Sequence, residues 1–573
     1  MEKKGAAKML EEIGVLLELK GENPFKSRAY YSAARTVEMM GEDALCKIVH
    51  EDKLKDVKGI GSALNEKLKE FVLTGSLPYY EDLKSSVPGG LLEMLRLPGL
   101  GPRKVRALCD MLEITTLAEL EYACRENRLA NLKGFGAKTQ GKILAGIDFI
   151  RRSEGQFFYN EARNIAEKLL EKIKDFPGIE EVSLAGSIRR CREIVKNIDL
   201  VASTKQPGRL KGFFAELPVI EEVIVLGETK VSVCLEEGIN ADLRVVKREE
   251  FPFALHHFTG SKEHNTALRH RAKSMGLKIN EYGIFQGEDL LSCRDETELF
   301  RTLNLSYIQP ELRENYGEIE AAQEGSLPTL IEDQDIKGIF HVHTNYSDGI
   351  NTLEEIVLYC LEAGYEYVGI TDHSQSAFYA RGLKAEDLVR QKEEIEGLRK
   401  KYPQLGIFHG VESDIRSDGS LDYDDTVLKQ LDFVIASVHS GLNMERGKMT
   451  ERLQQALSHP LITMFGHPTN RLLLGRDSSA LDLEVVFRAA LENNVILELN
   501  ASPARLDLDW RHLKKIKAMG LTVSINPDAH HLASFEDTGL GVATARKGWL
   551  EKNDVFNTRS RLEVEDYLDR RLN

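Results

Sequence analysis

The sequence predicts a multidomain protein of the α+β and α/β classes, in which a helical N-terminal region and a mixed middle part precede a parallel α/β barrel. Three observations support this prediction. At 573 residues the chain is too long for a single hydrophobic core. A helical pattern over the first 150 residues is interrupted by short Gly-x-Gly segments. Beyond residue 336, apolar runs alternate with amphipathic stretches, which is typical of a parallel sheet with crossover helices.

The composition is that of an ordinary globular protein, with 42% hydrophobic and 29% charged residues. No apolar run approaches the length of a transmembrane helix and the N-terminus lacks a signal-peptide pattern, so we expect no membrane association and a cytoplasmic location. Seven scattered cysteines without a Cys-x-x-Cys pair predict reduced thiols. The net charge of −15 by itself argues against nucleic-acid binding, but local basic clusters and helix N-termini bind phosphate on acidic proteins too.

Three pieces of the helical region are alike, because each places an apolar-flanked Gly-x-Gly before a new helix. The glycines allow a tight turn, and the next helix presents free N–H groups and its positive dipole end to an anion. One such turn is more often a plain connection, whereas three resemble helix-hairpin-helix motifs, which contact a DNA backbone without reading base sequence. The predicted DNA-contact glycines are Gly59, Gly61, Gly99, Gly101, Gly134 and Gly136.

The C-terminal part of the chain contains seven apolar runs that end repeatedly in metal-ligand residue types. In an extended segment alternate side chains share a face, so His341 and His343 point the same way, and Asp348 returns from the next loop. The carboxyl ends of parallel barrel strands meet on one face. The full candidate set of metal ligands is His341, His343, Asp348, His373, Glu412, His439, His467, Asp528 and His530.

This part of the chain resembles the polymerase-and-histidinol-phosphatase (PHP) domain, a distorted (βα)7 barrel that holds up to three metal ions. All nine ligand positions of that family are matched. Mixed histidine and carboxylate ligands favour Mn, Zn or Fe. The alternative, histidines that only satisfy hydrogen bonds in a core, explains nine matches poorly. We keep this structural interpretation for four histidines that match no motif position: His409, His459, His512 and His531.

Two segments that flank the first Gly-x-Gly, 22–34 and 65–71, resemble the small N-terminal domain of X-family DNA polymerases. In that family one lysine forms a Schiff base with an abasic sugar, and a lysine and a tyrosine hold the 5′-phosphate. Lys67 matches the nucleophile, and Lys26 and Tyr30 match the phosphate positions. The chemistry requires an amine that is neutral enough to attack a carbonyl. The alternative is that Lys67 is a solvated lysine on an amphipathic helix.

The segments around Gly186 and Asp242 resemble the nucleotidyltransferase palm of the same family. There, Gly-Ser before a helix holds the triphosphate, and carboxylates on two neighbouring strands hold two magnesium ions for in-line phosphoryl transfer. The resemblance implies that Asp199 and Asp242 are catalytic metal ligands, and it continues through the thumb. The implied nucleotide-binding residues are Gly186, Ser187, Arg190, Phe258, Gly260, Asn265 and Arg269.

The palm departs from the family pattern Gly-Asp-x-Asp, because this chain reads Lys196-Asn197-Ile198-Asp199. Asn197 offers one carbonyl oxygen and no charge where a carboxylate should bridge two metal ions. Lys196 replaces the glycine that lets the backbone approach the triphosphate, and His257 replaces a tyrosine. We therefore expect a correctly built palm that is catalytically weakened, and that binds Mg or Mn if it is active.

Over essentially the whole chain the sequence resembles a bacterial X-family DNA polymerase with a C-terminal PHP domain. The resemblance implies a monomeric DNA-repair enzyme that acts on gapped, nicked or abasic DNA with deoxynucleoside triphosphates. It implies gap-filling synthesis in the palm, and metal-dependent 3′–5′ exonuclease and abasic-site endonuclease activity in the barrel. Two alternatives stay open, a PHP phosphatase of small metabolites and a non-catalytic DNA-binding protein. The expected parts are a lyase-like domain (1–85), helix-hairpin-helix fingers (86–150), palm (151–250), thumb (251–317), polar linker (318–335) and PHP barrel (336–573).

Overall fold

The computed structural model describes residues 3–572 except 39, 41–43, 52, 58–59, 98, 130–131, 133 and 154. The predicted DNA-contact residue Gly59 therefore lies outside the described residues. The chain forms two compact units, Met1–Ile147 and Asp148–Asn573. None of the helices in the described ranges combines the length and the apolar character that crossing a membrane requires.

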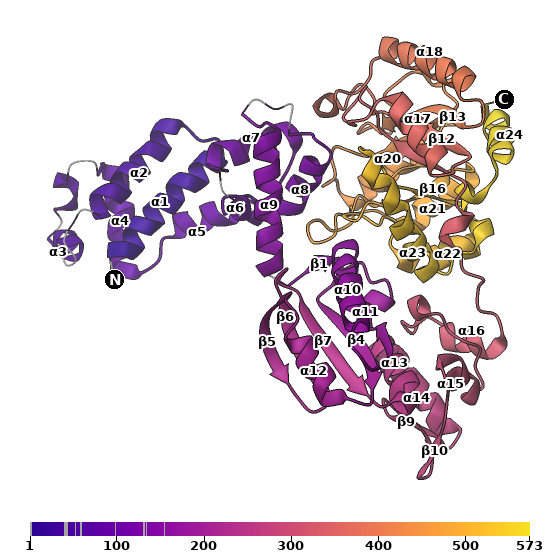
Figure 1. Cartoon of the computed structure of the whole chain (residues 1–573). Helices are drawn as coiled ribbons and strands as arrows, with labels where there is room; N and C mark the ends of the chain where they lie inside the picture. The colour runs from indigo at the N-terminus through magenta and orange to yellow at the C-terminus, as the bar shows by residue number, and fades with distance from the viewer. Residues whose placement is uncertain are drawn as a thin grey trace. The chain divides into compact units, whose positions relative to one another are not determined.

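The first unit consists of helices joined by short turns (Figure 1). Apolar residues three or four positions apart form one face of the first helix, where Leu10, Ile13 and Leu17 are fully buried. This face packs against the second helix. The helices are α1 (Lys3–Leu19), α2 (Pro24–Glu38), α3 (Ala44–His50), α4 (Ser62–Thr74), α5 (Pro78–Ser85), α6 (Gly89–Met94), α7 (Pro102–Leu112), α8 (Leu117–Arg125) and α9 (Ala137–Ser153).

The three Gly-x-Gly segments precede α4, α7 and α9, as the sequence predicts. Gly61 and Gly101 are the residues directly before α4 and α7, with extended backbone. Gly99 and Gly134 have φ values of +85° and +92°, which only glycine adopts without strain. The tight turn therefore depends on the first glycine of the second and third segments.

The palm is built on a five-stranded sheet of order β2-β4-β7-β6-β5, in which only β4 and β7 run parallel to each other. Helices α10 (Tyr159–Lys174) and α12 (Pro207–Ala215) cover one face (Figure 1). Because side chains alternate along a strand, Leu200 faces these helices, and Asp199 and Val201 face the other way, toward α13. The strands are β2 (Ile179–Leu184), β4 (Asn197–Thr204), β5 (Ile220–Leu226), β6 (Lys230–Leu235) and β7 (Asn240–Val246); β1 (Phe157–Phe158) pairs with β3 (Ile194–Val195), and α11 (Gly186–Arg189) follows β2.

The thumb combines helices with a three-stranded antiparallel sheet of order β10-β9-β8. Part of the predicted linker is helical, because Ile319 and Ala322 pack into the thumb core and order the segment around them. The elements are α13 (Phe251–Thr259), α14 (Lys262–Ser274), β8 (Lys278–Asn280), β9 (Gly283–Gln286), β10 (Asp289–Leu291), α15 (Glu296–Thr302) and α16 (Glu318–Glu324).

Seven parallel strands in sequence order form the C-terminal barrel, so the predicted (βα)7 fold is confirmed. A bridge between Val342 and Ala529 joins the first strand to the end of the last. The strands are fully buried, which explains their continuous apolar runs. They are β11 (Gly338–Val342), β12 (Tyr367–Ile370), β13 (Gly406–Asp414), β14 (Phe433–Ser437), β15 (Met464–Phe465), β16 (Ile496–Asn500) and β17 (Val523–Asn526).

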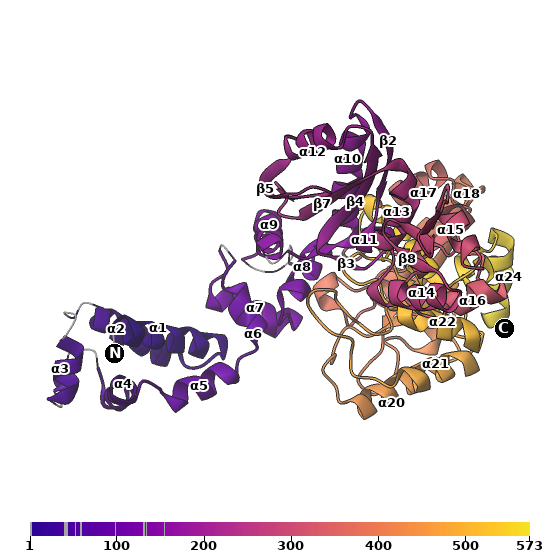
Figure 2. The same cartoon turned by 90° about the horizontal axis from the view of Figure 1, so that it is seen from below.

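Amphipathic helices surround these strands, among them α17, α18, α20 and α21 (Figure 2). The ring of Phe340 lies 5.1 Å from that of Phe433 and 6.1 Å from that of Phe408, between centroids, and this aromatic cluster packs on α24 through Val564 and Leu568. The helices are α17 (Leu353–Glu362), α18 (Ala385–Lys401), α19 (Asp425–Leu428), α20 (Arg446–Leu457), α21 (Leu483–Glu492), α22 (Trp510–Met519), α23 (Thr538–Lys547) and α24 (Arg561–Leu572).

Helix α23 joins the barrel to the palm and thumb within the second unit. Lys547 at its end is fully buried, and its Nζ donates hydrogen bonds to Glu314 Oε1 at 2.7 Å and to the carbonyl oxygen of Arg190 at 2.9 Å. Arg546 pairs with Glu311 at 2.8 Å. The barrel is therefore bound to the palm and thumb through buried charges.

Candidate functional sites

The nine predicted metal ligands come together at the carboxyl ends of the barrel strands. Eight of them are buried residues and the side chain of the ninth, His439, is 4% exposed. They form four overlapping groups in which the potential ligand atoms lie within 4.8 Å of one another. The groups are His343, Asp348, His373 and His530; His341, Glu412 and His467; His341, His343 and Asp528; and His373, Glu412 and His439.

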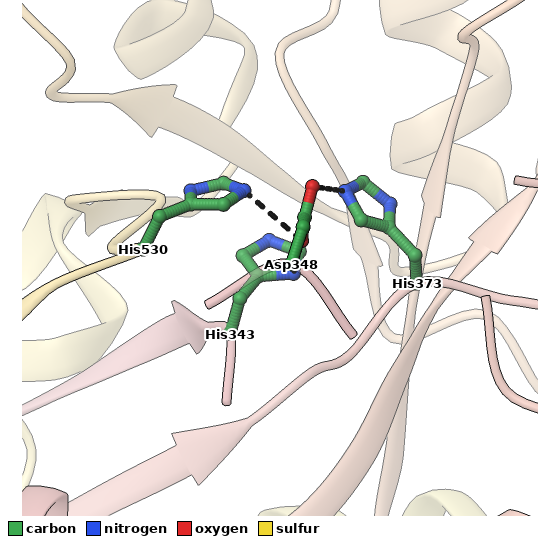
Figure 3. Close-up of side chains that lie close together, drawn as sticks. All are labelled: His343, Asp348, His373 and His530. Carbon is green, nitrogen blue, oxygen red and sulfur yellow. Dashed lines mark ion pairs between the residues drawn. The ribbon is translucent and has the colours of Figure 1, made fainter. Parts of the chain in front are cut away.

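Two carboxylates lie between the histidines of this cluster. Asp348 has His373 Nε2 at 3.5 Å on one side and His530 Nε2 at 3.4 Å on the other (Figure 3). Glu412 Oε1 lies 3.2 Å from Nε2 of both His341 and His439, and 3.0 Å from that of His467. Glu412 therefore belongs to two of the four groups, whereas Asp348 belongs to one.

The donor set fits metal ions. Both ring nitrogens of His343 and Nε2 of His341 and His439 are buried without a hydrogen-bond partner among the described residues. Burial alone would raise the pKa of Glu412, but the imidazoles of His439 and its other neighbours hold that pKa well below its usual range. Buried nitrogens without partners beside buried carboxylates are costly unless cations occupy the space between them.

Three of the predicted ligands have left-handed backbone conformations. The φ values are +61° at His341, +26° at His467 and +53° at Asp528. Such conformations cost roughly 1–3 kcal/mol for residues other than glycine and cluster at functional sites. The strand ends therefore turn their side chains toward the cluster at a cost in stability.

The palm places its two predicted carboxylates side by side. Asp199 and Asp242 are direct partners in the parallel register of β4 and β7. Asn197 Nδ2 donates to Asp199 Oδ1 at 2.9 Å, and the ammonium of Lys230 lies 2.7 Å from Asp242 Oδ2. Ser232 donates to Asp242 Oδ1 at 2.6 Å. An amide and an ammonium thus hold both carboxylates.

Burial, together with the charge of Asp242, raises the pKa of Asp199 to about 6. Gly186 lies directly over this carboxylate, with φ at +60°, and a Cβ there would lie 2.0 Å from Asp199 Oδ2. The turn before α11 therefore requires glycine for its close approach to Asp199. The palm offers a divalent cation two carboxylates, Asp199 and Asp242, and the backbone at Gly186. These are fewer potential ligands than the barrel offers.

In the first unit, Lys67 lies on α4 in an aromatic pocket. Its Nζ donates to Tyr30 Oη at 2.8 Å and lies 3.5 Å from the ring centroid of Tyr79. Burial lowers the pKa of Lys67, and the charge of Lys26 acts in the same direction. Lys26 itself faces Glu22 at 3.4 Å. The structure therefore brings the three predicted lyase residues together.

Comparison with known proteins identifies the parts of the chain. The DNA polymerase beta thumb family matches residues 254–314 and the PHP domain family residues 340–502; the helix-hairpin-helix domain family matches 1–77 and the SAM-like helix-hairpin-helix tandem 91–148. The chain is 40% identical over 574 residues to the DNA polymerase/3'-5' exonuclease PolX of Bacillus subtilis (strain 168), and the match covers 100% of both chains. The chain belongs to the bacterial X-family DNA polymerases with a PHP domain.

About a third of the chain is also similar to smaller proteins. A probable phosphatase of Caldicellulosiruptor saccharolyticus is 31% identical over 203 residues, which cover 33% of this chain and 78% of the relative. A probable phosphatase of Thermoanaerobacter sp. (strain X514) is 28% identical over 194 residues, which cover 30% of this chain and 76% of the relative.

The predicted nucleotide-binding residues of this X-family polymerase lie around the junction of palm and thumb. Arg190 donates to the carbonyl oxygen of Thr259 at 2.6 Å and to Glu314 at 3.0 Å. Asn265 donates to the carbonyl oxygens of His257 and Gly260 at 2.7 and 3.2 Å. Ser187 is the second residue of α11, and the guanidinium of Arg244 lies 4.7 Å from the ring centroid of Phe258. Arg269 donates to the carbonyl oxygen of Asn265, and Lys196 is exposed.

Several supporting residues of the metal cluster escaped the sequence prediction. Glu498 on β16 accepts from His341 Nδ1 at 2.6 Å and from the backbone N–H of His467 at 2.6 Å. Asp414 accepts from His439 Nδ1. An acid inside an apolar strand, as at Glu498, is the one signal that could have revealed such a residue. Tyr79, which lies over Lys67, left no sequence signal of this kind.

The four histidines assigned to structural roles belong to none of the metal-ligand groups found among the described residues. His409 is buried beside Gln391 Oε1 at 3.1 Å, and burial lowers its pKa to about 3. His459 contacts Asp425 at 3.2 Å, His512 packs 6.2 Å from the ring of Phe487, and His531 contacts Ser534.

Proposed function

We propose that the barrel is a metal-dependent phosphodiesterase that removes nucleotides from the 3′ end of DNA and cleaves DNA at abasic sites. The observation that supports this best is the complete set of nine buried ligands at one end of the barrel. They suit a cluster of up to three ions of Mn, Zn or Fe. The helix-hairpin-helix regions on the same chain favour DNA as the substrate over a small metabolite.

In this mechanism the protein supplies fixed ligands and orientation. Bound ions would activate water and neutralise the charge that develops on the phosphodiester. Glu498 accepts the Nδ1 proton of His341, so Nε2 keeps its lone pair for binding, and Asp414 does the same for His439. Burial of all nine side chains excludes bulk water and fixes their rotamers.

The proposal predicts that His341→Ala combined with His343→Ala lowers exonuclease activity by several orders of magnitude. Removing two ligands empties at least one metal position. Metal content by elemental analysis and degradation of a 5′-labelled, 3′-recessed DNA are the two measurements. His459→Ala is the matched control, because this histidine lies outside the metal-ligand groups. Unchanged degradation by a folded double variant would disprove the assignment, and faster turnover of a sugar-phosphate monoester than of DNA would favour a phosphatase.

We also propose that the palm binds deoxynucleoside triphosphates with Mg or Mn but inserts them slowly. Asn197 removes one negative charge from the metal-binding face, and Lys230 neutralises part of another. Gapped, nicked or abasic DNA is the proposed substrate, and a monomer acting in the cytoplasm is the proposed form.

A second candidate function is supported by the pocket around Lys67, where we propose abasic-site lyase activity. The amine would attack the C1′ aldehyde of an abasic sugar, and loss of water would give a Schiff base. Removal of a C2′ proton by a base would then break the C3′–O bond and release the 3′-phosphate, and hydrolysis of the Schiff base would restore the lysine. The ring of Tyr79 also stabilises the cationic form of this adduct, because a π face attracts a cation.

This lyase proposal predicts that borohydride traps the chain on abasic DNA, and that Lys67→Ala abolishes trapping while Lys69→Ala, on the same helix, does not. A lowered pKa makes the neutral amine more abundant at a given pH, so the trapping rate rises with pH and reaches half its maximum below 10.5, the ordinary value for lysine. Equal trapping by the Lys67→Ala variant would assign the reaction to another amine.

A further inference from the structure

The turn η5 (Phe378–Ala380) follows the metal-ligand residue His373 and is closely bound to it. The N–H of Leu383 donates to the carbonyl oxygen of His373 at 2.8 Å, and that of Gly382 donates to Ala377 at 3.0 Å. A Cβ at Gly382 would lie 1.8 Å from the carbonyl oxygen of Ser374, so only glycine lets the loop close this tightly. The turn is therefore a built part of the barrel face that carries the metal cluster.

Two further contacts connect this turn to the predicted ligands. The ring of Tyr379 lies 6.3 Å from that of His373, edge to face. Ser376 Oγ donates to Asp414 Oδ2 at 2.7 Å, and the other oxygen of Asp414 accepts from His439 Nδ1. The turn thus contacts His373 directly and His439 through Asp414. These two contacts fix its position relative to the cluster.

The turn presents an aromatic ring to solvent. Phe378 is 74% exposed, and its ring lies 5.9 Å from that of Tyr379. Ala377 and Ala380 on either side are fully buried and provide the packing of the turn. Phe378 therefore contributes little to the core, and its exposed ring is connected to the predicted ligand His373 through the ring of Tyr379.

A cationic side chain is connected to the loop that bears this ring. Arg416 is half exposed and pairs at 3.1 Å with Asp422, whose other oxygen accepts from the N–H of Ser376 at 2.6 Å. One carboxylate thus connects the arginine with the loop that bears Phe378. Flat rings beside a cationic side chain are what proteins use to bind single-stranded nucleic acid, with bases stacked on the rings and phosphates near the cation.

We propose that Phe378 is the stacking site for the unpaired base at the 3′ end of a DNA strand, with Arg416 near its phosphate, so that the terminal phosphodiester lies at the metal cluster. This inference rests on the proposed exonuclease function and assigns its substrate subsite. A small sugar phosphate has no base to stack and would gain nothing from Phe378. A free strand end also suits a single exposed ring better than a duplex does, because duplex bases are already stacked.

The test uses the full-length protein and two single-stranded oligonucleotides of equal length. One ends at its 3′ side in an ordinary nucleotide, and the other ends in a tetrahydrofuran abasic sugar, which offers no base. Stacking is worth roughly a 5- to 100-fold change in affinity per base. We expect Phe378→Ala to raise KM about tenfold for the base-ended strand, with little change in kcat and no change for the abasic-ended strand. Phe378→Trp should restore the KM of the base-ended strand, and Phe378→Leu should not.

Direct binding gives a second readout that needs no turnover. A 2-aminopurine at the 3′ terminus should lose fluorescence on binding the wild-type protein and the Phe378→Trp variant, and not on binding the Phe378→Ala variant. Equal effects of Phe378→Ala on both strands, or none on either while the wild type degrades DNA, would overturn the stacking assignment. A change in self-association instead of DNA binding would assign Phe378 to a protein contact and would also overturn it. A wild type that quenches 2-aminopurine but degrades neither strand would contradict the exonuclease proposal alone.

Discussion

At the scale of single residues, the two sites of the second unit differ in how completely their charges are arranged. All nine predicted barrel ligands are convergent, whereas in the palm the amide of Asn197 donates a hydrogen bond to Asp199 and Lys230 pairs with Asp242. An amide N–H and an ammonium occupy carboxylate oxygens that a metal ion would need. The sequence predicts the loss of a charge at Asn197, and the structure adds the competing cation.

The palm therefore predicts slow nucleotide insertion that a double substitution accelerates. A missing bridging carboxylate costs roughly several kcal/mol at the transition state, so Lys196→Gly with Asn197→Asp should raise insertion by about a thousandfold or more. Manganese should partly rescue the unmodified palm. The measurement is single-nucleotide insertion into gapped DNA by a chain that also carries His341→Ala and His343→Ala, so that degradation cannot hide synthesis.

The control for this experiment is Asp199→Ala in the accelerated variant, which should return insertion to background. Brisk insertion by the unmodified palm would show that Asp199 and Asp242 suffice, and that the interpretation of Asn197 is wrong.

The convergence of the nine predicted ligands could be foreseen because most of them end or follow an apolar run, and the carboxyl ends of parallel strands must meet. Glu498 and Asp414 could not, because their role depends on which ligand histidine the barrel places opposite them. Tyr79 was missed for a similar reason, since it lies on α5 and meets Lys67 of α4 only through packing. Sequence spacing shows which side chains share a strand, and folding decides which strands are neighbours.

At the scale of elements, the turns before α7 and α9 support a prediction about DNA binding. Gly99 and Gly134 have φ near +90° with open space around the position of a Cβ, so alanine there meets backbone strain and no clash. Strain of about 1–2 kcal/mol per turn should weaken binding of gapped DNA roughly 5- to 30-fold, and each lost phosphate contact should lower the salt slope by about one. Binding is measured by fluorescence anisotropy over a range of salt concentrations.

Gly208→Ala is the matched control, because it also has open space but lies in α12 without a left-handed backbone. An affinity for gapped DNA that changed neither with the salt concentration nor with the Gly99→Ala and Gly134→Ala substitutions would contradict a backbone-binding role for the turns.

The element prediction succeeded where the hydrophobic pattern was unambiguous. The barrel strands are buried on both faces and read as apolar runs, and α17 and α21 show one apolar face each. Helix α16 was missed because its seven residues are mostly polar or small and its order comes from two contacts, Ile319 and Ala322, with the thumb core. A short polar helix of this kind is stabilised by tertiary packing, which local sequence does not reveal.

At the scale of the whole molecule, the second unit joins two sites of different chemistry through buried charges. Glu314 of the thumb binds Arg190, a predicted nucleotide-binding residue, and also Lys547 of the barrel helix α23. The sequence offered no sign of this contact, because the three residues lie far apart along the chain. The charge of Glu314 is thus shared between a palm residue and the barrel.

The final prediction concerns this junction. Lys547→Met keeps most of the side-chain volume but removes the ammonium that Glu314 and two carbonyl oxygens accept from, and losing one partner of a buried pair typically costs about 3–5 kcal/mol. We expect the contact between barrel and thumb to open more often, so glutamyl endopeptidase should cleave the connecting segment 318–335 faster.

Lys552→Met is the matched control, because Lys552 pairs with Asp335 of the same segment at 3.0 Å but is half exposed, and such surface pairs contribute about 0–1 kcal/mol. Glu314 keeps its pair with Arg190 in the Lys547→Met variant, so adding Glu314→Gln removes a second ion pair at the junction and should speed cleavage further. If both lysine variants were cleaved at the wild-type rate, the buried charges would not be what holds the barrel to the thumb.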